Sequence, residues 1–169
     1  MLLFRHDADA GFKTLYLKRL PANKVVPLNT SSMTPIEPTN TLQDILRILL
    51  GAFMVLAAIA HMTFERAAFK AQVPDWVPVG KDLVVILSGI VELALGLCLI
   101  FWAGERVWVG IALAIFYVLI FPGNIAQYVN HTSAFGLNTD RARLIRLFFQ
   151  PVLILWALWC TGALKYLFK

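Results

Sequence analysis

The stretch ILSGIVELALG, residues 86–96, decides the fold class of this chain. It has the apolar and small residues of a membrane helix, yet it carries one acidic residue, Glu92, near its middle. An acidic side chain at that depth costs about 3 kcal/mol to insert, so it needs a partner or a role inside the protein. The stretch therefore predicts a membrane helix with one face turned into a bundle, and it marks Glu92 as a candidate functional residue.

The composition of the whole chain indicates a membrane protein. Of 169 residues, 59% are hydrophobic and 15% are charged, and the mean hydropathy is +0.72. A soluble domain of this length has too small an interior to bury so much apolar surface. Four apolar runs reach the roughly 20 residues that a bilayer crossing takes. They cover Leu42–Phe64, Leu83–Ala103, Val107–Gln127 and Leu147–Phe168. Because only helices satisfy such backbones in lipid, we expect an all-α, polytopic membrane protein with a four-transmembrane-helix bundle.

The first 40 residues differ from the remainder of the chain. They mix charged and apolar residues and then become rich in Pro, Ser, Thr and Asn. Phe12–Leu20 combines aromatic, Leu and basic residues in the way that interfacial helices do. We expect residues 1–40 to form a mobile or interfacial N-terminal tail and residues 41–169 to form one transmembrane domain.

The net charge of +5 comes from basic residues scattered along the edges of the spans. That distribution favours membrane lipids as partners and argues against nucleic acid. Of the 15 Lys and Arg residues, nine lie on the side of the termini and six on the other. The positive-inside rule then places the termini in the cytoplasm. Without the four basic residues of the first 20, however, the count is five against six.

The two cysteines are expected to be packing residues. Cys98 and Cys160 lie inside predicted spans and form no C-x-x-C motif. A buried, unpaired cysteine behaves as a small apolar residue, so thiol–disulfide exchange is not the expected activity.

Helical spacing places the small and polar residues of each span on one face. In the second span, Ser88, Gly89 and Gly96 share the face of Glu92. The same spacing aligns Arg47, Gly51, Met54, Ala58, His61 and Glu65 in the first span, Gly110, Tyr117, Asn124 and Tyr128 in the third, and Arg143, Arg146, Gln150, Ala157 and Thr161 in the fourth. We expect these faces to point inward, because small residues let membrane helices approach and polar groups avoid lipid.

Five of these polar residues fall in the same half of the predicted bundle. They are His61, Glu92, Asn124, Arg146 and Gln150. Their positions predict a polar half-cavity with Glu92 as its floor, opening towards loops 65–81 and 129–141. We predict that these five residues bind a ligand.

Glu92 also has a structural interpretation. A carboxyl group hydrogen-bonded to Gln150 or Asn124 would hold the helices in register without binding anything. A salt bridge between Glu92 and Arg146 is compatible with either interpretation. Binding or proton handling and helix registration therefore stay open as alternatives.

His61 and Arg146 have alternatives too. Glu65 follows His61 by one helical turn, so the two predict an orienting pair or a titrating switch. The chain has only three histidines, and the other two fall in the tail and a loop, so we expect no metal site. Arg146 is near a span end, where arginines commonly extend to lipid headgroups.

Four segments together resemble the DoxX-like family of small bacterial membrane proteins. They are RILLGAFMVLAAIAHMTFERAAFKAQVPDWVP (47–78), LSGIVELALGLCLIF (87–101), FPGNIAQY (121–128) and RLFFQPVLILWAL (146–158). Their order and spacing carry the resemblance, which covers about residues 45–160. It implies four transmembrane helices in the bacterial inner membrane. Members named DoxX and DoxD are associated with thiosulfate:quinone oxidoreductase and with membrane redox complexes.

The expected function is the binding of a lipophilic molecule in the polar half-cavity, with quinone as the candidate cofactor. The sequence shows no haem-ligand pair, no C-x-x-C motif and no Gly-rich flavin loop. Redox work would therefore require a partner subunit, which makes this chain an accessory subunit. One alternative is a non-catalytic scaffold or assembly factor, in which the polar residues only specify the bundle. Another is a small transporter or proton pathway, which would have to be a homo-oligomer because four helices are few for alternating access.

Overall fold

The computed structural model describes residues 38–168, and every regular element in that range is a helix. The elements are α2 (Thr41–Met62), α3 (Arg66–Gln72), α4 (Lys81–Phe101), η3 (Ala103–Glu105), α5 (Arg106–Val129), α6 (Asp140–Cys160) and α7 (Ala163–Leu167). The predicted helix at Phe12–Leu20 and nearly all of the predicted tail lie outside the described residues.

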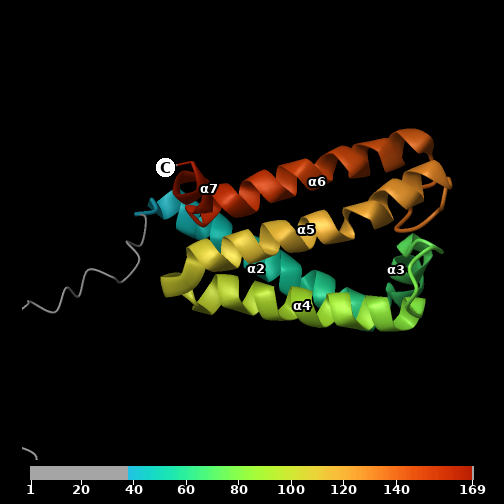
Figure 1. The fold of residues 1–169 in the computed structure, drawn as a ribbon, viewed down its shortest axis with the longest axis horizontal. Coiled ribbons are helices and arrows are strands. Elements are labelled where there is room, and N and C mark those ends of the chain that lie inside the picture. The colour runs from blue at the N-terminus through green and yellow to red at the C-terminus, as the bar shows by residue number, and fades with distance from the viewer. Residues whose placement is uncertain (1–37, 169) are drawn as a thin grey trace, which may run out of the picture. The chain divides into compact units, whose positions relative to one another are not determined.

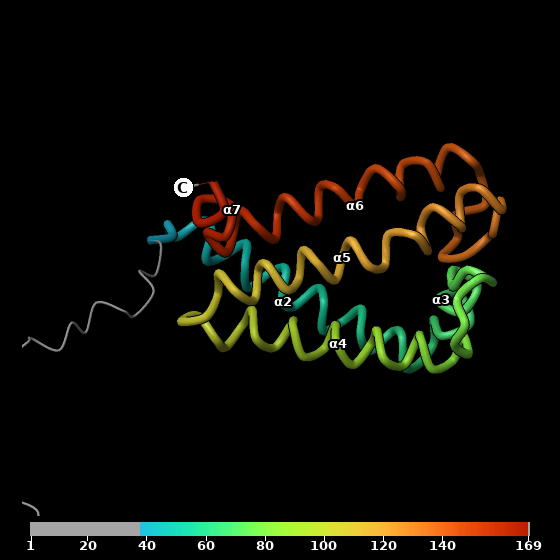
Figure 2. Tube along the Cα trace, viewed as in Figure 1, coloured from blue at the N-terminus to red at the C-terminus, as the bar shows by residue number. Residues whose placement is uncertain are grey.

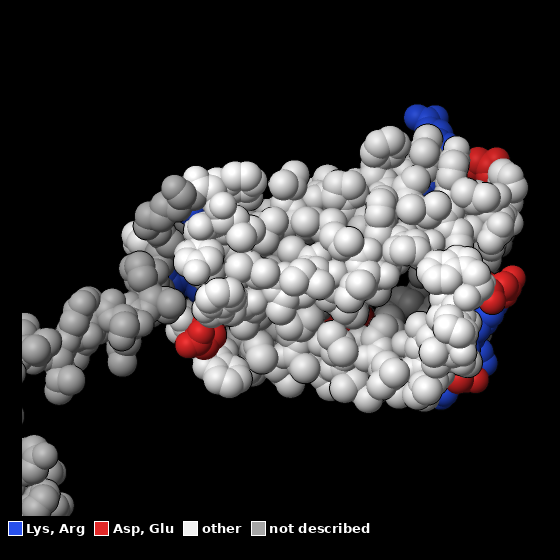
Figure 3. Space-filling model, in the orientation of Figure 1, with Lys and Arg blue, Asp and Glu red and all other residues white. Residues whose placement is uncertain are grey.

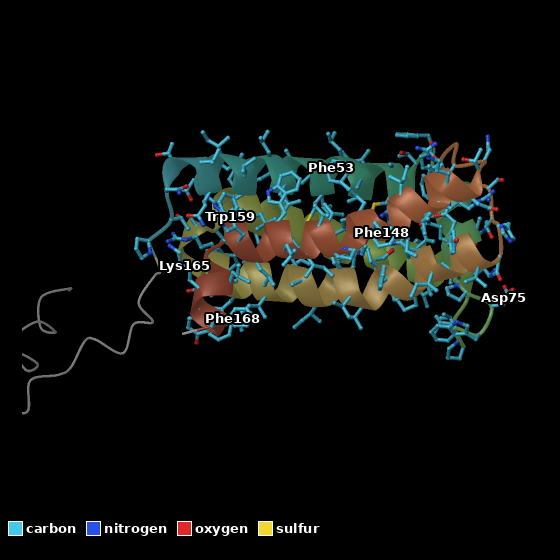
Figure 4. The ribbon with its side chains drawn as sticks, turned by 90° about the horizontal axis from the view of Figure 1, so that it is seen from above. Phe53, Asp75, Phe148, Trp159, Lys165 and Phe168 are labelled. Atoms are coloured by element: carbon cyan, nitrogen blue, oxygen red, sulfur yellow. The ribbon has the colours of Figure 1, made fainter. Side chains whose placement is uncertain are left out.

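Four of the helices, α2, α4, α5 and α6, are long and apolar enough to cross a membrane. Figures 1 and 2 show that α2 and α5 run towards α3, whereas α4 and α6 return towards α7. In Figure 3 the charged side chains gather at the two ends of the bundle, and the face between them is almost entirely uncharged. Figure 4 shows Asp75 at the α3 end and Lys165 at the opposite end, with Phe53 and Phe148 between them. The predicted four-helix membrane bundle is therefore confirmed.

The bounds of the first three spans were predicted to within two residues, but those of the fourth were wrong. The expected run was Leu147–Phe168, whereas α6 spans Asp140–Cys160. The helix starts early because the Thr139 hydroxyl accepts a hydrogen bond from the Ala142 amide (3.2 Å) and caps its first turn. It ends early because Gly162 has a φ of 77°, a conformation that glycine adopts readily and that stops the helix before α7.

Hydrogen bonds at the α7 end of the bundle fasten α2 to its neighbours. The Asn40 side chain accepts from the Gln43 amide (2.8 Å), and Gln43 Oε1 accepts from the Asn40 amide (3.0 Å). This reciprocal capping fixes where α2 begins. Gln43 Nε2 also donates to the Trp159 carbonyl of α6 (2.7 Å), and Arg47 Nη1 donates to the Leu99 carbonyl of α4. The buried polar groups at this end thus join three spans.

The spans pack as two pairs, α2 along α4 and α5 along α6. In the first pair, the backbones of Gly51 and Gly96 approach so closely that a Cβ on Gly51 would lie 2.8 Å from the Gly96 carbonyl oxygen. The apolar core between the pairs fills the half of the bundle near α7. Its members are Leu50, Met54, Leu99, Leu113, Phe116, Tyr117, Leu153, Ala157 and Cys160. The other half of the bundle is left for the polar residues.

Ion pairs organise the α3 end. Arg66 Nη2 and Lys70 Nζ of α3 lie 3.0 and 2.8 Å from the Asp82 carboxylate, which begins α4. Lys81 lies 2.6 Å from Asp75, and this hydrogen bond holds the pKa of the Asp75 carboxyl below its ordinary value. The sequence predicted a loop over residues 65–81, and α3 is the part of that segment that it missed. The short helix has no buried residue of its own, so its sequence lacks the apolar stripe from which a helix is predicted.

Replacing Gly51 by Ala is expected to destabilise the bundle by about 1–3 kcal/mol, because the new methyl group must push the α2 and α4 backbones apart. Alanine is the better helix former, so a loss of stability can come only from this clash. The measurement is the thermal unfolding of the purified protein in detergent. Gly104→Ala is the matched control, since a Cβ there meets nothing within 4 Å. Equal melting temperatures for the two variants would contradict the proposed close packing.

Candidate functional site

A cavity of about 470 Å³ lies in the half of the bundle near α3. All four spans contribute to its walls, and α3 and the following loop cover its polar end. Figure 3 shows a hollow on the viewed face between α4 and α5, with acidic side-chain atoms visible beside it. Its size is within the range of pockets that hold small molecules, roughly 300–1,000 Å³.

All five residues that the sequence singled out line this cavity. They are His61 from α2, Glu92 from α4, Asn124 from α5, and Arg146 and Gln150 from α6. The structure thus confirms that they share one pocket in the predicted half of the bundle, facing α3. Their role in ligand binding stays a prediction.

His61 and Glu92 form the contact between α2 and α4 at the cavity wall. His61 Nε2 lies 3.2 Å from Glu92 Oε2, and both side chains are about nine-tenths buried. On the other side of the ring, Nδ1 lies 3.3 Å from Ser88 Oγ and 3.5 Å from the Val85 carbonyl. The predicted pairing of His61 with Glu65 is wrong, because α2 ends at Met62, before Glu65, and the carboxylate that contacts His61 is that of Glu92.

The hydrogen-bond partners of His61 favour a hydrogen on its Nδ1. The Ser88 hydroxyl is placed to donate to the Val85 carbonyl (3.0 Å), and with that bond made both groups beside Nδ1 are acceptors. Glu92 Oε2 is buried and receives no hydrogen bond from the described residues. With a neutral His61 ring and an ionised Glu92 carboxylate, the lone pairs of Nε2 and Oε2 would face each other, and these two atoms are 3.2 Å apart. The pair is satisfied when one proton lies between Nε2 and Oε2, which makes it neutral overall.

Gln150 links α6 to α5 at the opposite wall. It is 1% exposed, its Oε1 accepts from Asn124 Nδ2 (2.9 Å), and its Nε2 donates to the Tyr117 carbonyl (2.8 Å). The hydrogen bonds predicted from Glu92 to Gln150 or Asn124 are therefore wrong, because the two amides bond to each other. At the cavity, the His61–Glu92 contact lies within the α2–α4 pair and the Asn124–Gln150 hydrogen bond within the α5–α6 pair, and the cavity separates the two.

Arg146 has few partners for a charged group in this position. Its Nη1 donates to Gln150 Oε1 over 3.4 Å, which is a long hydrogen bond. The predicted salt bridge with Glu92 is not formed within 4 Å, although the two residues interact electrostatically across the cavity. The guanidinium group is thus left facing the cavity with most of its donors unused.

Sequence reasoning missed the residues that close the cavity at its polar end. Phe69 of α3 packs on the His61 ring with centroids 3.3 Å apart and on Phe135 with centroids 4.6 Å apart. Gln72 donates to Gln127 Oε1, which ties the end of α3 to α5. Only Gln127 carried a usable signal, because it follows Asn124 by three positions and so shares its helix face. Among the described residues, no group of three or more His, Cys, Asp or Glu is arranged to hold a metal ion.

The fold and the cavity define a multi-pass membrane protein with an internal pocket between two helix pairs. The chain belongs to a family described as "Domain of unknown function (DUF8561)", whose model matches residues 50–161. The matched range contains all five predicted site residues, helices α3, α4, α5 and α6 in full, and the second half of α2. No curated protein and no solved structure matches the chain.

Replacing Gln150 by Leu is expected to cost about 0.5–2 kcal/mol of stability, because Asn124 and the Tyr117 carbonyl lose their buried partner. The measurement is again thermal unfolding in detergent. Val152→Leu, on the exposed side of the same helix, is the control and should leave the melting temperature unchanged. If Gln150→Leu unfolds at the temperature of the wild-type protein, the amide does not join α5 to α6.

Proposed function

We propose that this protein binds a lipophilic molecule with a polar head in the cavity between its two helix pairs. The observation that carries the proposal is the combination of an apolar wall with a polar floor at membrane depth. Phe116, Ile120 and Leu153 provide apolar lining, whereas His61 and Glu92 provide polar groups. A pocket of this kind suits a molecule that is soluble in lipid and has a head that forms hydrogen bonds.

The side opening of the cavity supports access from the bilayer. Leu119 of α5 lines the cavity and is 72% exposed on the membrane-facing surface. Phe53 of α2 also lines it and is 52% exposed. At the polar end, by contrast, α3 and its loop cover the cavity. A ligand dissolved in the bilayer therefore has a shorter path to the site than one dissolved in water.

Quinone is the candidate that the resemblance to the DoxX-like family supplies, and a role as accessory subunit of a membrane redox assembly goes with it. The shared proton of His61 and Glu92 would serve as the proton source that quinone reduction needs. Electrons would have to come from a partner subunit. A scaffold without a ligand would need the same helix contacts, so the test below has to separate binding from bundle assembly.

The test is mass spectrometry of the small lipophilic molecules that copurify with the protein in nanodiscs. We expect about one molecule per chain for the wild type and a loss of it in His61→Ala and Glu92→Ala, because both substitutions remove polar groups of the cavity. Phe148→Ala is the control, since Phe148 is exposed and does not line the cavity.

The same lipids in all four proteins, without a fixed ratio to the chain, would support a scaffold instead. Melting temperatures recorded on the same samples separate the loss of the ligand from the loss of the fold. A variant that keeps its melting temperature but loses the molecule locates the site.

We further propose that the protein lies in the bacterial inner membrane with its termini in the cytoplasm. An even number of spans puts Thr41 and Cys160 on the same side, opposite to α3. Fusions after residue 169 test this: a green fluorescent protein should fluoresce there, and alkaline phosphatase should be inactive. The reverse pattern would place α3 and the polar end of the cavity in the cytoplasm.

A further inference from the structure

Arg146 is the only Lys or Arg among the described residues that lines the cavity. Its one hydrogen bond goes to the neutral Gln150 amide over 3.4 Å, and no carboxylate lies within ion-pair distance of it. A partly buried charge without a counter-ion is costly at membrane depth. The Arg146 guanidinium group therefore requires an anionic partner within ion-pair distance, which the described part of the chain does not provide.

Other cations at the same end of the bundle show the contrast. Arg66 and Lys70 both pair with Asp82. Arg143 pairs with Asp140 (2.6 Å) and donates to the Thr132 carbonyl (3.2 Å) as well. Carboxylates thus pair with Arg66, Lys70 and Arg143 at this end, whereas Arg146, which faces the cavity, has no such partner.

Glu92 does not fill this role. Its Oε2 contacts His61 Nε2 (3.2 Å), it forms no ion pair with Arg146 within 4 Å, and it lies further along its helix from the α3 end than Arg146 does. Glu92 follows the first residue of α4 by eleven positions, which is roughly 16 Å of helix rise from the α3 end. Arg146 follows the first residue of α6 by six positions, which is roughly 9 Å.

We infer that the ligand is an amphiphile with one alkyl chain and a carboxylate head. Arg146 binds the carboxylate, and the alkyl chain leaves the bundle between α4 and α5. Arginine suits this head because its parallel N–H groups match the two oxygens of a carboxylate. The head then lies nearer the membrane surface than the chain, as in the surrounding lipid. Leu119 lines the cavity and is exposed on the outer surface, so it stands where the alkyl chain would enter the hydrocarbon. This inference rests on the proposed function and narrows its ligand class.

The experiment is native mass spectrometry of the purified protein in detergent with four probes. Oleate, 1-monooleoylglycerol and oleoyl lysophosphatidic acid have the same chain and different heads, and decylubiquinone is an uncharged quinone. We expect the wild type to keep one oleate per chain and to bind it roughly tenfold or more tightly than 1-monooleoylglycerol. Arg146→Gln should abolish this preference, Arg146→Lys should retain most of it, and Phe148→Leu should leave it unchanged.

Each outcome has one meaning. If lysophosphatidic acid binds tightly and oleate does not, the head of the ligand is anionic but is a phosphate, which overturns the carboxylate. Equal or tighter binding of 1-monooleoylglycerol or decylubiquinone by the wild type overturns the anionic head, yet leaves the proposed function standing. Binding of none of the four probes overturns both. The ranking of probes by the wild type needs no variant, so the inference is testable even if Arg146→Gln fails to fold.

Discussion

A bilayer interior offers no hydrogen bonds to a protein, and this constraint shapes every span of the bundle. Polar side chains within the spans must find partners inside the protein, so Glu92, Asn124 and Gln150 are all buried. Large apolar side chains such as Leu119 and Phe148 are exposed instead. The usual relation between burial and hydrophobicity in soluble proteins is thereby reversed at many positions of the helices.

The polar contacts do not spread evenly through the interior. One set, His61 with Glu92, joins α2 to α4, and another set, Asn124 with Gln150, joins α5 to α6. Close glycine packing strengthens the first pair near the other end of the bundle, where Gly51 meets Gly96. Because both of these contacts lie within a pair, neither of them draws the two pairs together at this end. The cavity follows from this division of the hydrogen bonds.

Much of this arrangement could be predicted from the sequence, because membrane helices obey simple rules of length and periodicity. The helical spacing of Met54, Ala58 and His61 located the inward face of α2, and the depth of Glu92 located the floor of the pocket. The choice of partners could not be predicted. A spacing of four residues favoured Glu65 for His61, but the tight α2–α4 contact brought Glu92 closer.

The missed features have a common physical origin. Helix α3 buries no residue of its own, so its sequence has no periodic apolar pattern from which it could be predicted. It contacts its neighbours through Phe69, through Gln72 and through ion pairs with Asp82 of α4. The fourth span was predicted to start at Leu147, where its apolar run begins, so Arg143 lay before it. In the structure, contacts with Asp140 of α6 and with the Thr132 carbonyl of the preceding loop satisfy that arginine, and α6 includes it. Long-range contacts of this kind depend on the assembled bundle.

The cover that α3 forms over the polar end has a consequence for how the site fills. Phe69 and Gln72 hold this cover against His61 and Gln127, while the side of the cavity faces hydrocarbon. For the proposed ligand, occupancy would be governed by its mole fraction among the lipids, and its molarity in water would matter only through partitioning. Two membranes bathed in the same solution would load this protein differently if their lipids dissolve the ligand to different extents.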